Sequence, residues 1–426
     1  MLEISRIRSD YNAVVTGLRK RNLSPETMQL VDEVLQQDDQ RKMIQSELDQ
    51  LLAQRNQLSK EIGSLMQQDK REEAETMKQS VADIKITAES LQEKLNSAKD
   101  RIEAILLQLP NVPQAIVPEG RSADDNEMYR EWKGPLPAPG EKPEPHWELG
   151  KKYRLFDFEL GVKITGSGFP LYRGKGAKLQ RALIRLFLDK AIDAGYEEII
   201  PPLLVNEDSA RATGQLPDKE GQMYHCTVDN LYLIPTAEVP VTNIYRDVIV
   251  QESDFPIKLT GYTPCFRREA GSYGSDVKGL NRVHQFDKVE IVQFQHPDQS
   301  DKALLEMVEH VAGILDELGL PYRIVRLCGG DLGHTSSITY DFEVFSAAQQ
   351  KWLEVSSVSN FETFQTNRMR LRFRNAEGQN QLAHSLNGSA LALARVVAAL
   401  LEYYQTSDGI EMPFVLIPYT GFERID

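Results

Sequence analysis

The chain has 426 residues, of which 41% are hydrophobic and 26% are charged, and its formal net charge is −14. This length predicts two or three domains, and the composition is typical of a soluble globular protein. The negative charge argues against a protein that coats nucleic acid through a general basic surface, although it is compatible with a local basic patch that faces one RNA.

The cysteines and the N-terminus indicate the compartment. Cys226, Cys265 and Cys328 show no CxxC spacing, which argues against both a disulfide framework and a cysteine-rich zinc site. The N-terminus lacks the apolar core of a signal peptide, and no run of about 18 apolar residues occurs anywhere. We therefore expect a cytoplasmic protein that is not bound to a membrane.

Residues 1–108 predict an N-terminal domain dominated by a helical hairpin at about 26–106. Ser24 is suited to the N-cap of the first helix and Pro25 to its first helical position. Apolar residues then recur in steps of three and four on both sides of a polar break, which is the spacing of a coiled-coil seam: Ile44, Leu48, Leu51, Leu58, Ile62 and Leu65, then Met77, Val81, Ile84, Ala88, Leu91, Leu95, Ala98, Ile102 and Ile105. Two helices of roughly 40 residues predict an antiparallel arm about 60 Å long.

The arm alone leaves two functions open. Coiled coils commonly serve as spacers or oligomerisation devices. Because Lys and Arg alternate with acidic residues along both helices, the arm is also suited to reach a large partner such as an RNA. Its sequence does not separate these alternatives.

Residues 109–150 are rich in Pro and Gly and are interpreted as a linker, with the body of the chain at 151–426. Runs of adjacent strands with helices at their flanks predict an α+β fold with a mostly antiparallel sheet. The main expected elements are helices at 174–194 and 298–318, strands at 322–327, 340–344 and 352–357, and a last helix that ends near 405.

The segment Thr260 to Phe294 predicts two antiparallel strands joined by a long loop at Gly271 to Gly279. Arg267, Arg268 and Glu269 stand at the end of the first strand. Guanidinium groups beside a glycine-rich loop are suited to a polyphosphate, because they bind phosphate bidentately. The alternative is a surface hairpin with a solvated charge cluster.

Five acids lie at or next to expected strands: Glu238, Glu269, Glu290, Glu343 and Glu354. Buried carboxylates need partners, so this placement suggests a polar pocket on one face of the sheet, although structural ion pairs would explain any one of them. Together with Arg267 and Arg395, such acids are suited to a magnesium-bound nucleotide. The sequence has neither a GxGxxG fingerprint nor a Walker A loop, so the nucleotide must bind in another geometry.

Six short segments follow the arm in order: TAE at 236–238, FRRE at 266–269, VHQFDKVE at 283–290, EVSS at 354–357, SNFETFQTNRM at 359–369 and LNGSALALAR at 386–395. Each is weak alone, but all six in this order, with the arm in front, resemble the seryl-tRNA synthetases of the bacterial type. These are class II aminoacyl-tRNA synthetases, and the resemblance covers nearly the full chain.

The resemblance implies a class II catalytic domain with a six- to seven-stranded antiparallel sheet, and a homodimer with residues 195–202 at its interface. It implies a serine–tRNA ligase that forms seryl-adenylate from L-serine and ATP and transfers the seryl group to tRNA(Ser), with tRNA(Sec) as a second candidate. The arm would grip the long variable arm of the tRNA. Mg²⁺ is the implied cofactor, and no zinc is expected.

By position, the resemblance implies a serine pocket formed by Thr236, Ala237, Glu238, Glu290 and Ser389. In the implied ATP site, Arg267 contacts the α-phosphate, Glu269 the adenine amino group and Arg395 the γ-phosphate. The same site includes Arg268, Val283, Glu354, Val355, Ser356 and Ser357. Of these, Glu354 and Ser357 would coordinate the magnesium ion.

Three positions depart from the family pattern. Leu353 stands where an arginine often precedes the Glu-Val-Ser-Ser run, His334 lies in a segment that is usually more apolar, and Ala394 occupies a common glycine position.

Three other functions are alternatives to a serine–tRNA ligase. A class II-like protein that loads a carrier protein would lack the arm. A non-catalytic coiled-coil protein would not retain Arg267, Glu269, Glu354 and Arg395 together. A synthetase for threonine or proline is the third, and the lack of a Cys/His cluster argues against a zinc-dependent threonine pocket.

Overall fold

The computed structural model describes residues 1–136, 143–218, 221–269 and 278–426. The chain divides into two compact units, one made of residues 1–19 and 23–110, the other of residues 20–22 and 111–426. Among the described residues, no helix is both long and apolar enough to cross a membrane.

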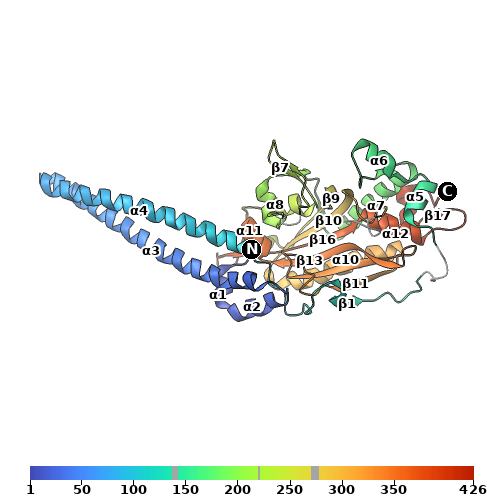
Figure 1. Ribbon diagram of the computed structural model, residues 1–426, viewed down its shortest axis with the longest axis horizontal. Helices are drawn as coiled ribbons and strands as arrows, with labels where there is room; N and C mark the ends of the chain where they lie inside the picture. The colour runs from blue at the N-terminus through green and yellow to red at the C-terminus, as the bar shows by residue number, and fades with distance from the viewer. Residues whose placement is uncertain (137–142, 219–220, 270–277) are drawn as a thin grey trace. The chain divides into compact units, whose positions relative to one another are not determined.

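The first unit consists of four helices, α1 (Ile4–Ser9), α2 (Tyr11–Arg19), α3 (Pro25–Gln67) and α4 (Arg71–Leu106). Ser24 caps α3 as expected, since its side chain accepts a hydrogen bond from the backbone N–H of Thr27 at 3.2 Å. The long helices α3 and α4 run antiparallel and side by side (Figure 1). The expected helical hairpin is thereby confirmed.

The seam of the hairpin uses the apolar stripe expected from the sequence. Leu48 of α3 packs with Ala88, Leu91 and Leu95 of α4, and all four are buried. The stripe is narrow, and the remaining faces of both helices carry polar and charged residues. At 1.5 Å per residue, the 43 residues of α3 extend about 64 Å.

The second unit is built on an eight-stranded sheet in the order β1-β11-β12-β13-β16-β10-β9-β4. Neighbouring strands are antiparallel except at the edge, where β4 is parallel to β9. In this order the strands are Glu127–Arg130, Tyr322–Arg326, Ile338–Ser346, Lys351–Glu362, His384–Ala392, Gln285–Gln295, Ile257–Phe266 and Glu197–Glu198. The α+β class predicted from the sequence is confirmed.

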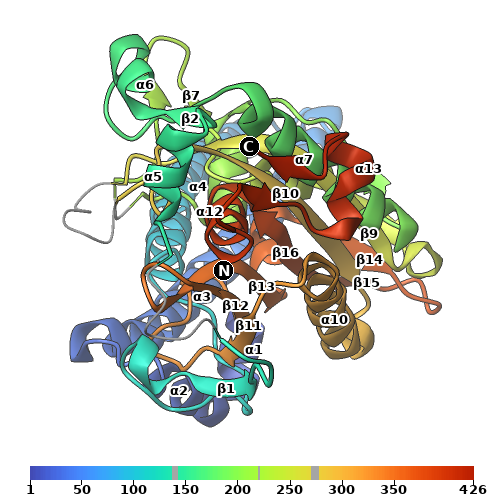
Figure 2. The same cartoon turned by 90° about the vertical axis from the view of Figure 1, so that its right-hand side faces the viewer.

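Three helices bury the main core against one face of the sheet: α7 (Gly174–Asp193), α10 (Ser300–Leu318) and α12 (Leu393–Tyr403). Figure 2 shows α10 and α7 beside the strands. Alternation along a strand decides which side chains join this core. On β10, Val289 and Ile291 lie in it, whereas Lys288 and Glu290 line a cavity.

Shorter elements complete the second unit. The helices are α5 (His146–Lys152), α6 (Phe158–Ile164), α8 (Glu207–Thr213), α9 (Glu238–Asn243), α11 (Phe364–Met369) and α13 (Ile417–Thr420). Small sheets pair β2 (Phe156–Asp157) with β3 (Leu171–Tyr172), β17 (Ile410–Glu411) with β18 (Arg424–Ile425), β7 (Leu231–Leu233) with β5 (Leu204–Val205) and β6 (His225–Cys226), and β14 (Arg372–Arg374) with β8 (Ile249–Gln251) and β15 (Asn380–Leu382). Four 3₁₀ turns are described, η1 (Ala123–Asp125), η2 (Glu252–Asp254), η4 (Pro297–Gln299) and η5 (Phe414–Leu416).

Two expectations about this unit differ from the structure. The segment 109–150, interpreted as a linker, contributes β1 to the sheet and contains most of α5. The sheet has eight strands, where the resemblance implied six to seven. Both differences arise from short edge strands, which are held by hydrogen bonds to a neighbour far away in sequence and carry little local pattern.

A tripeptide from near the N-terminus also belongs to the second unit. Arg21 is buried, and its guanidinium group donates hydrogen bonds to the carbonyl oxygens of Asn111, Leu332, Gly333 and Ser336. On either side of it, Lys20 donates to the carbonyl of Val117 at 2.8 Å, and Asn22 donates to the carbonyl of Gly120 at 2.5 Å.

Candidate functional site

A cavity of about 520 Å³ opens on the sheet of the second unit. Its lining comes mainly from β9, β10, β13 and β16 and from the segments that flank them. On β16, Asn387 and Ser389 line the cavity, whereas Leu386 and Ala390 point into the core under the helices. The cavity therefore lies on the sheet face opposite that core.

One end of the cavity holds a buried polar cluster. The hydroxyl of Thr236 donates a hydrogen bond to Glu290 at 3.1 Å, and Lys288 forms an ion pair with Glu290 at 2.5 Å. Ser389 lies directly across from Glu290 on the neighbouring strand. A carboxylate, two hydroxyls and an ammonium thus meet in one small volume, which is chemistry suited to a small polar ligand.

Glu238 adds the second carboxyl group of this cluster. It begins α9, and its side chain accepts a hydrogen bond from Gln365 at 2.7 Å. Burial, followed by the charge of Glu290, raises the pKa of Glu238 to about 7. A raised pKa in a carboxyl group that lines a cavity is typical of a functional site, and a bound ammonium would lower it again.

Arginines also line the cavity. The guanidinium group of Arg267 lies 5.3 Å from the ring centre of Phe286. Arg282 forms an ion pair with Glu269 at 3.1 Å, and the backbone of Glu269 adopts a left-handed conformation with φ of 48°. Val283, which is buried, lines the cavity beside them. The expected hairpin of β9 and β10 is confirmed, and it brings Arg267, Glu269 and Val283 to one wall.

Arg395 at the start of α12 reaches the same wall. Its Nε donates to the carbonyl of Asn281 at 3.0 Å, and its Nη1 donates to the carbonyl of Glu354 at 2.6 Å. These bonds use two of its five donor hydrogens. The remaining donors are available to a polyanion, which is how arginine commonly recognises phosphate.

Glu354, Ser357 and Asp341 supply oxygen atoms beside Arg395. Ser357 donates to Glu354 at 3.5 Å, and it faces Asp341 across the strands. Burial, together with the charge of Glu354, raises the pKa of Asp341 well above its usual range, and its Oδ1 has no hydrogen-bond partner among the described residues. Arg395 Nη1 lies 4.0 Å from Glu354 Oε1, so this carboxylate already faces one cation. Its oxygens and the hydroxyl of Ser357 are also suited to Mg²⁺, which proteins commonly hold through one or two carboxylates and the phosphates of a substrate.

The described part of the chain contains no site of the usual kind for a metal ion held by protein ligands alone. No group of three or more His, Cys, Asp or Glu side chains there is arranged to hold an ion. Any Mg²⁺ at Glu354 and Ser357 would therefore share its coordination sphere with a bound nucleotide.

Most side chains expected in the site line the cavity: Thr236, Glu238, Arg267, Glu269, Val283, Glu290, Glu354, Val355, Ser356, Ser357, Ser389 and Arg395. Ala237 is fully buried next to it, and Arg268 stacks on Tyr224 instead of lining it. Including Glu343 among the pocket acids was wrong, because Glu343 pairs with Arg323 outside the cavity. The expected loop at Gly271 to Gly279 falls, up to Val277, outside the described residues.

Several lining residues were not anticipated from the sequence, among them Lys288, Asn281, Arg282 and Asn387. Lys288 and Asn387 stand inside quoted motifs, two residues away from Glu290 and Ser389. The period of two along a strand puts such residues on the same face, so this signal was available. The Asn387 side chain lies near Glu238, where a hydrogen bond from its amide lowers the pKa of that carboxyl group.

Two family models match the chain. The model described as "Seryl-tRNA synthetase N-terminal domain" matches residues 1–113. The model described as "tRNA synthetase class II core domain (G, H, P, S and T)" matches residues 224–404, which include the cavity residues of β9, β10, β13 and β16.

Curated relatives and solved structures agree with these models. The chain is 49% identical to the serine–tRNA ligase of Salinibacter ruber, with 100% of this chain and 99% of the relative aligned. It is 46% identical to that of Chlorobaculum parvum, with 100% of both aligned. The structure of seryl-tRNA synthetase from Pyrococcus horikoshii, complexed with ATP, matches with a TM-score of 0.93 and 32% identity over 100% of this chain and 99% of that one.

A more distant structure shares the fold alone. Prolyl-tRNA synthetase of Giardia lamblia matches with a TM-score of 0.56 at 17% identity, over 64% of this chain and 54% of that one.

Proposed function

The chain belongs to the seryl-tRNA synthetase family, and we propose that it is a serine–tRNA ligase whose two reaction steps take place in the cavity on the sheet. In the first step the carboxylate of L-serine attacks the α-phosphate of ATP, and pyrophosphate leaves. In the second step a hydroxyl of the 3′-terminal ribose of tRNA(Ser) attacks the seryl carbonyl, and AMP leaves.

The observation that carries the assignment is that one cavity holds two sets of binding groups. Carboxylates Glu238 and Glu290 and arginines Arg267 and Arg395 all line it. An amino acid with its ammonium at the two carboxylates and a triphosphate at the arginines would bring carboxylate and α-phosphate together in the same cavity. Such positioning supplies much of the rate enhancement of a bimolecular reaction.

In the serine pocket, Glu238 binds the substrate ammonium, while Glu290, Thr236 and Ser389 surround the substrate hydroxyl. Thr236 and Lys288 already orient Glu290 by their contacts at 3.1 and 2.5 Å. A pocket that hydrogen-bonds a hydroxyl rejects alanine, because polar groups would stay buried without partners. Ala237, buried at the start of α9, packs in the apolar core next to this pocket.

In the nucleotide pocket, Arg267 contacts the α-phosphate and stabilises the charge that develops there, and Arg395 holds the γ-phosphate. Glu269 accepts from the adenine amino group, with Val283 against the base. Val355 and Ser356 complete the pocket, with Arg268 stacked on Tyr224 next to it. Ser356 fixes the backbone of Ser389 through a hydrogen bond of 2.6 Å. No side chain is needed as a covalent nucleophile.

We assign Glu354 and Ser357 as the protein ligands of a Mg²⁺ ion that enters with ATP. Their oxygen chemistry supports this role, as does the partnerless oxygen of Asp341 beside them. When bound, the ion would neutralise phosphate charge.

The first unit is proposed to bind the long variable arm of tRNA through the hairpin of α3 and α4. The narrow seam supports this, because it leaves both helices with exposed polar faces suited to an RNA backbone. tRNA(Ser) is the partner that the family implies, and tRNA(Sec) is a second candidate.

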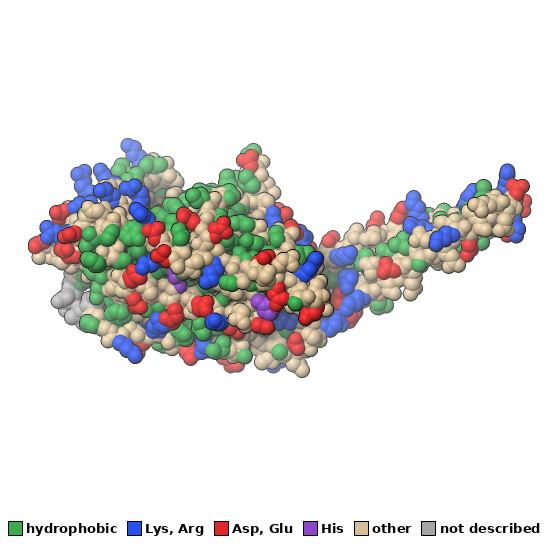
Figure 3. Space-filling view, turned by 180° about the vertical axis from the view of Figure 1, so that it is seen from behind, with side chains coloured by type: hydrophobic (Ala, Val, Ile, Leu, Met, Phe, Trp, Pro, Cys, Tyr) green, Lys and Arg blue, Asp and Glu red, His purple; other side chains and the backbone are tan. Residues whose placement is uncertain are grey.

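We also propose a homodimer in the cytoplasm. Ile200, which follows the edge strand β4, is 89% exposed, and such a residue beside an open sheet edge is typical of an interface. Apolar side chains also gather on the face of this unit shown in Figure 3. The three unpaired cysteines support a reducing compartment.

The test is ATP–pyrophosphate exchange with purified protein. Exchange should require serine and should be at least about 100-fold slower with alanine, threonine or proline at equal concentration. Exchange without any amino acid, or a preference for threonine or proline, would overturn the assignment.

A further inference from the structure

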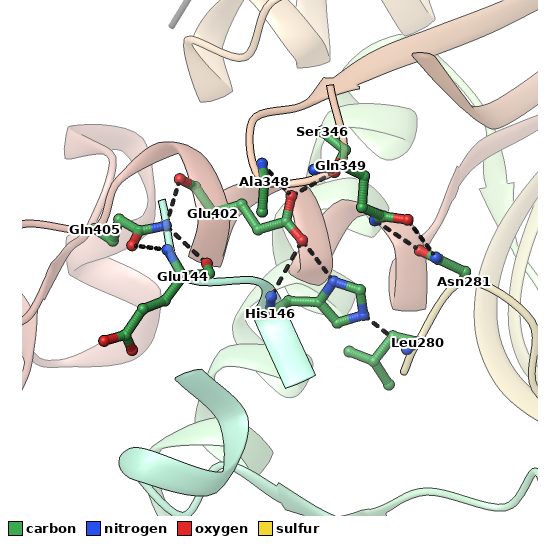
Figure 4. Close-up of polar contacts among 9 residues, drawn as sticks. All are labelled: Glu144, His146, Leu280, Asn281, Ser346, Ala348, Gln349, Glu402 and Gln405. Carbon is green, nitrogen blue, oxygen red and sulfur yellow. Dashed lines mark hydrogen bonds and ion pairs between the residues drawn. The ribbon is translucent and has the colours of Figure 1, made fainter. Parts of the chain in front are cut away.

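A buried pair of side chains joins α5 to α12 behind the nucleotide wall (Figure 4). His146 Nδ1 lies 2.7 Å from Glu402 Oε1, and both side chains are fully buried. The same carboxylate accepts hydrogen bonds from the backbone N–H of His146 at 3.1 Å, from the hydroxyl of Ser346 at 2.5 Å and from the backbone N–H of Ala348 at 3.2 Å.

The hydrogen bonds fix the tautomer of His146. The backbone N–H of Leu280 donates to His146 Nε2 at 2.9 Å, so Nε2 carries no proton. The ring proton must then lie on Nδ1, from which it is donated to Glu402. Burial would raise the pKa of Glu402, but the hydrogen bond from His146 leads the contacts that hold this pKa below its usual value.

The acceptor Nε2 is one of several contacts that fix residues 278–281. The ammonium of Lys278 lies 4.6 Å from the ring centre of Trp147. Gly279 has a φ of 68° and passes so close to His146 that a Cβ would collide with the ring. Asn281 and Gln349 pair through their amides at 2.8 and 3.3 Å.

The fixed segment in turn orients the nucleotide wall. The carbonyl of Asn281 accepts the Nε hydrogen bond of Arg395 at 3.0 Å. The next residue, Arg282, pairs with Glu269, and Val283 follows in the wall of the cavity. A shift of residues 280–281 would therefore move both the phosphate-binding arginine and the adenine-binding residues.

We propose that His146, held by Glu402, is a positioning residue that sets the nucleotide-binding wall through its hydrogen bond to Leu280. This inference rests on the proposed function, since it assumes that the wall binds ATP. The serine-pocket residues Thr236, Glu238, Glu290 and Ser389 are not among the contacts of His146 or of residues 280–281 described above, so loss of the bond should affect ATP and leave serine binding unchanged.

Two substitutions separate the roles of the two ring nitrogens of His146. His146→Asn keeps a donor near Nδ1 for Glu402 and loses the acceptor at Nε2, whereas His146→Gln keeps an acceptor near Nε2 and loses the donor. We expect His146→Asn to raise the KM for ATP about tenfold in serine-dependent exchange, with the KM for serine within twofold. His146→Gln should raise the KM for ATP less than threefold.

Two further variants keep the test decisive if the buried substitutions reduce folding. Gln349→Ala breaks the amide pair with Asn281 outside the buried pair, and should raise the KM for ATP about threefold. Tyr404→Phe is the control, because its hydroxyl donates to the carbonyl of Leu318 at 2.7 Å near the same end of α12 and has no contact with residues 278–281 in the described part of the chain. It should leave both KM values unchanged.

Calorimetric ATP binding without serine provides a readout that does not depend on the proposed amino acid. Weaker ATP binding by His146→Asn, but not by Tyr404→Phe, supports the positioning role even if the serine assignment fails. Equal effects of His146→Asn and His146→Gln, equal increases in both KM values, or unchanged ATP binding in His146→Asn and Gln349→Ala would overturn it.

Discussion

Glu238 and Glu290 place two carboxyl groups in one buried cluster, but their partners differ. Glu290 has Lys288 at 2.5 Å, whereas Glu238 accepts a hydrogen bond from the neutral amide of Gln365 at 2.7 Å. Burial and the neighbouring charge of Glu290 therefore raise the pKa of Glu238 to about 7. Glu238 is therefore the carboxyl group of this pocket that is suited to bind the ammonium of a substrate.

The difference between Glu238 and Glu290 predicts how kcat/KM for serine depends on pH. Because the ionised form of Glu238 binds the ammonium, kcat/KM for serine should rise with pH through about 7. Glu238→Gln should lower kcat/KM about 100-fold and remove this step. Exchange rates measured from pH 5.5 to 8.5 provide the test, with Glu343→Gln as a control outside the cavity. A step near pH 7 that persists in Glu238→Gln would contradict the assignment.

The same group predicts a trend in stability. The pKa of Glu238 is about 7 in the folded protein, above the 4.5 that is usual for a glutamate, so folding favours the protonated form. Its contribution is fully present below about pH 4.5 and is lost as pH rises through about 7. The Tm of Glu238→Gln relative to the parent protein should therefore rise between pH 5 and 8. Thermal unfolding without ligands measures this difference, and a constant difference would exclude the predicted titration.

Replacing the phosphate-binding arginines should impair the use of ATP. Arg267→Lys and Arg395→Lys keep the charge but lose the planar fork of donors. We expect each to reduce kcat/KM for ATP by about 10- to 100-fold, with Arg267→Lys acting mainly on kcat because it faces the reacting phosphate. Arg323→Lys, in the ion pair with Glu343 outside the cavity, is the matched control. Parent-like kinetics in Arg395→Lys would exclude its role.

Glu354 should control the magnesium requirement. Glu354→Gln removes the charge of the proposed ligand, so the Mg²⁺ concentration for half-maximal exchange should rise about tenfold. Glu343→Gln is a close control, since Glu343 lies opposite Glu354 on the neighbouring strand and does not line the cavity. Equal magnesium titrations for the two variants would refute this ligand.

Removing the arm should separate the two steps of the reaction. Replacing residues 26–106 with a short Gly/Ser linker keeps Lys20, Arg21 and Asn22 on the second unit. Serine-dependent exchange should stay within about threefold of the parent protein, while aminoacylation of tRNA(Ser) should be lost. Loss of both activities would show that the arm has a different role.

Local patterns explain which features the sequence predicted correctly. The cap at Ser24 and the seam through Leu48 and Leu91 depend on short spacings along one helix. The walls from β9 and β10 follow from two alternating segments that are close in sequence. These are interactions whose signal lies within a few tens of residues.

Long-range contacts explain what the sequence did not predict. β1 is held by β11, almost 200 residues later, and His146 receives its role from Glu402 and Leu280. Glu343 was wrongly included because alternation alone does not reveal that Arg323 pairs with it. The proline-rich composition around His146 indicates a linker and carries no sign of a buried partner.

The tripeptide Lys20–Asn22 also has a consequence for synthesis of the protein. It is synthesised before four residues whose carbonyl oxygens surround it, namely Asn111, Leu332, Gly333 and Ser336. The seam of the α-helical hairpin lies within residues 44–95, so the hairpin can form before the second unit is complete. The last acceptor of Arg21, Ser336, is synthesised more than 300 residues later. The buried guanidinium group therefore gains all its hydrogen bonds only when the second unit folds.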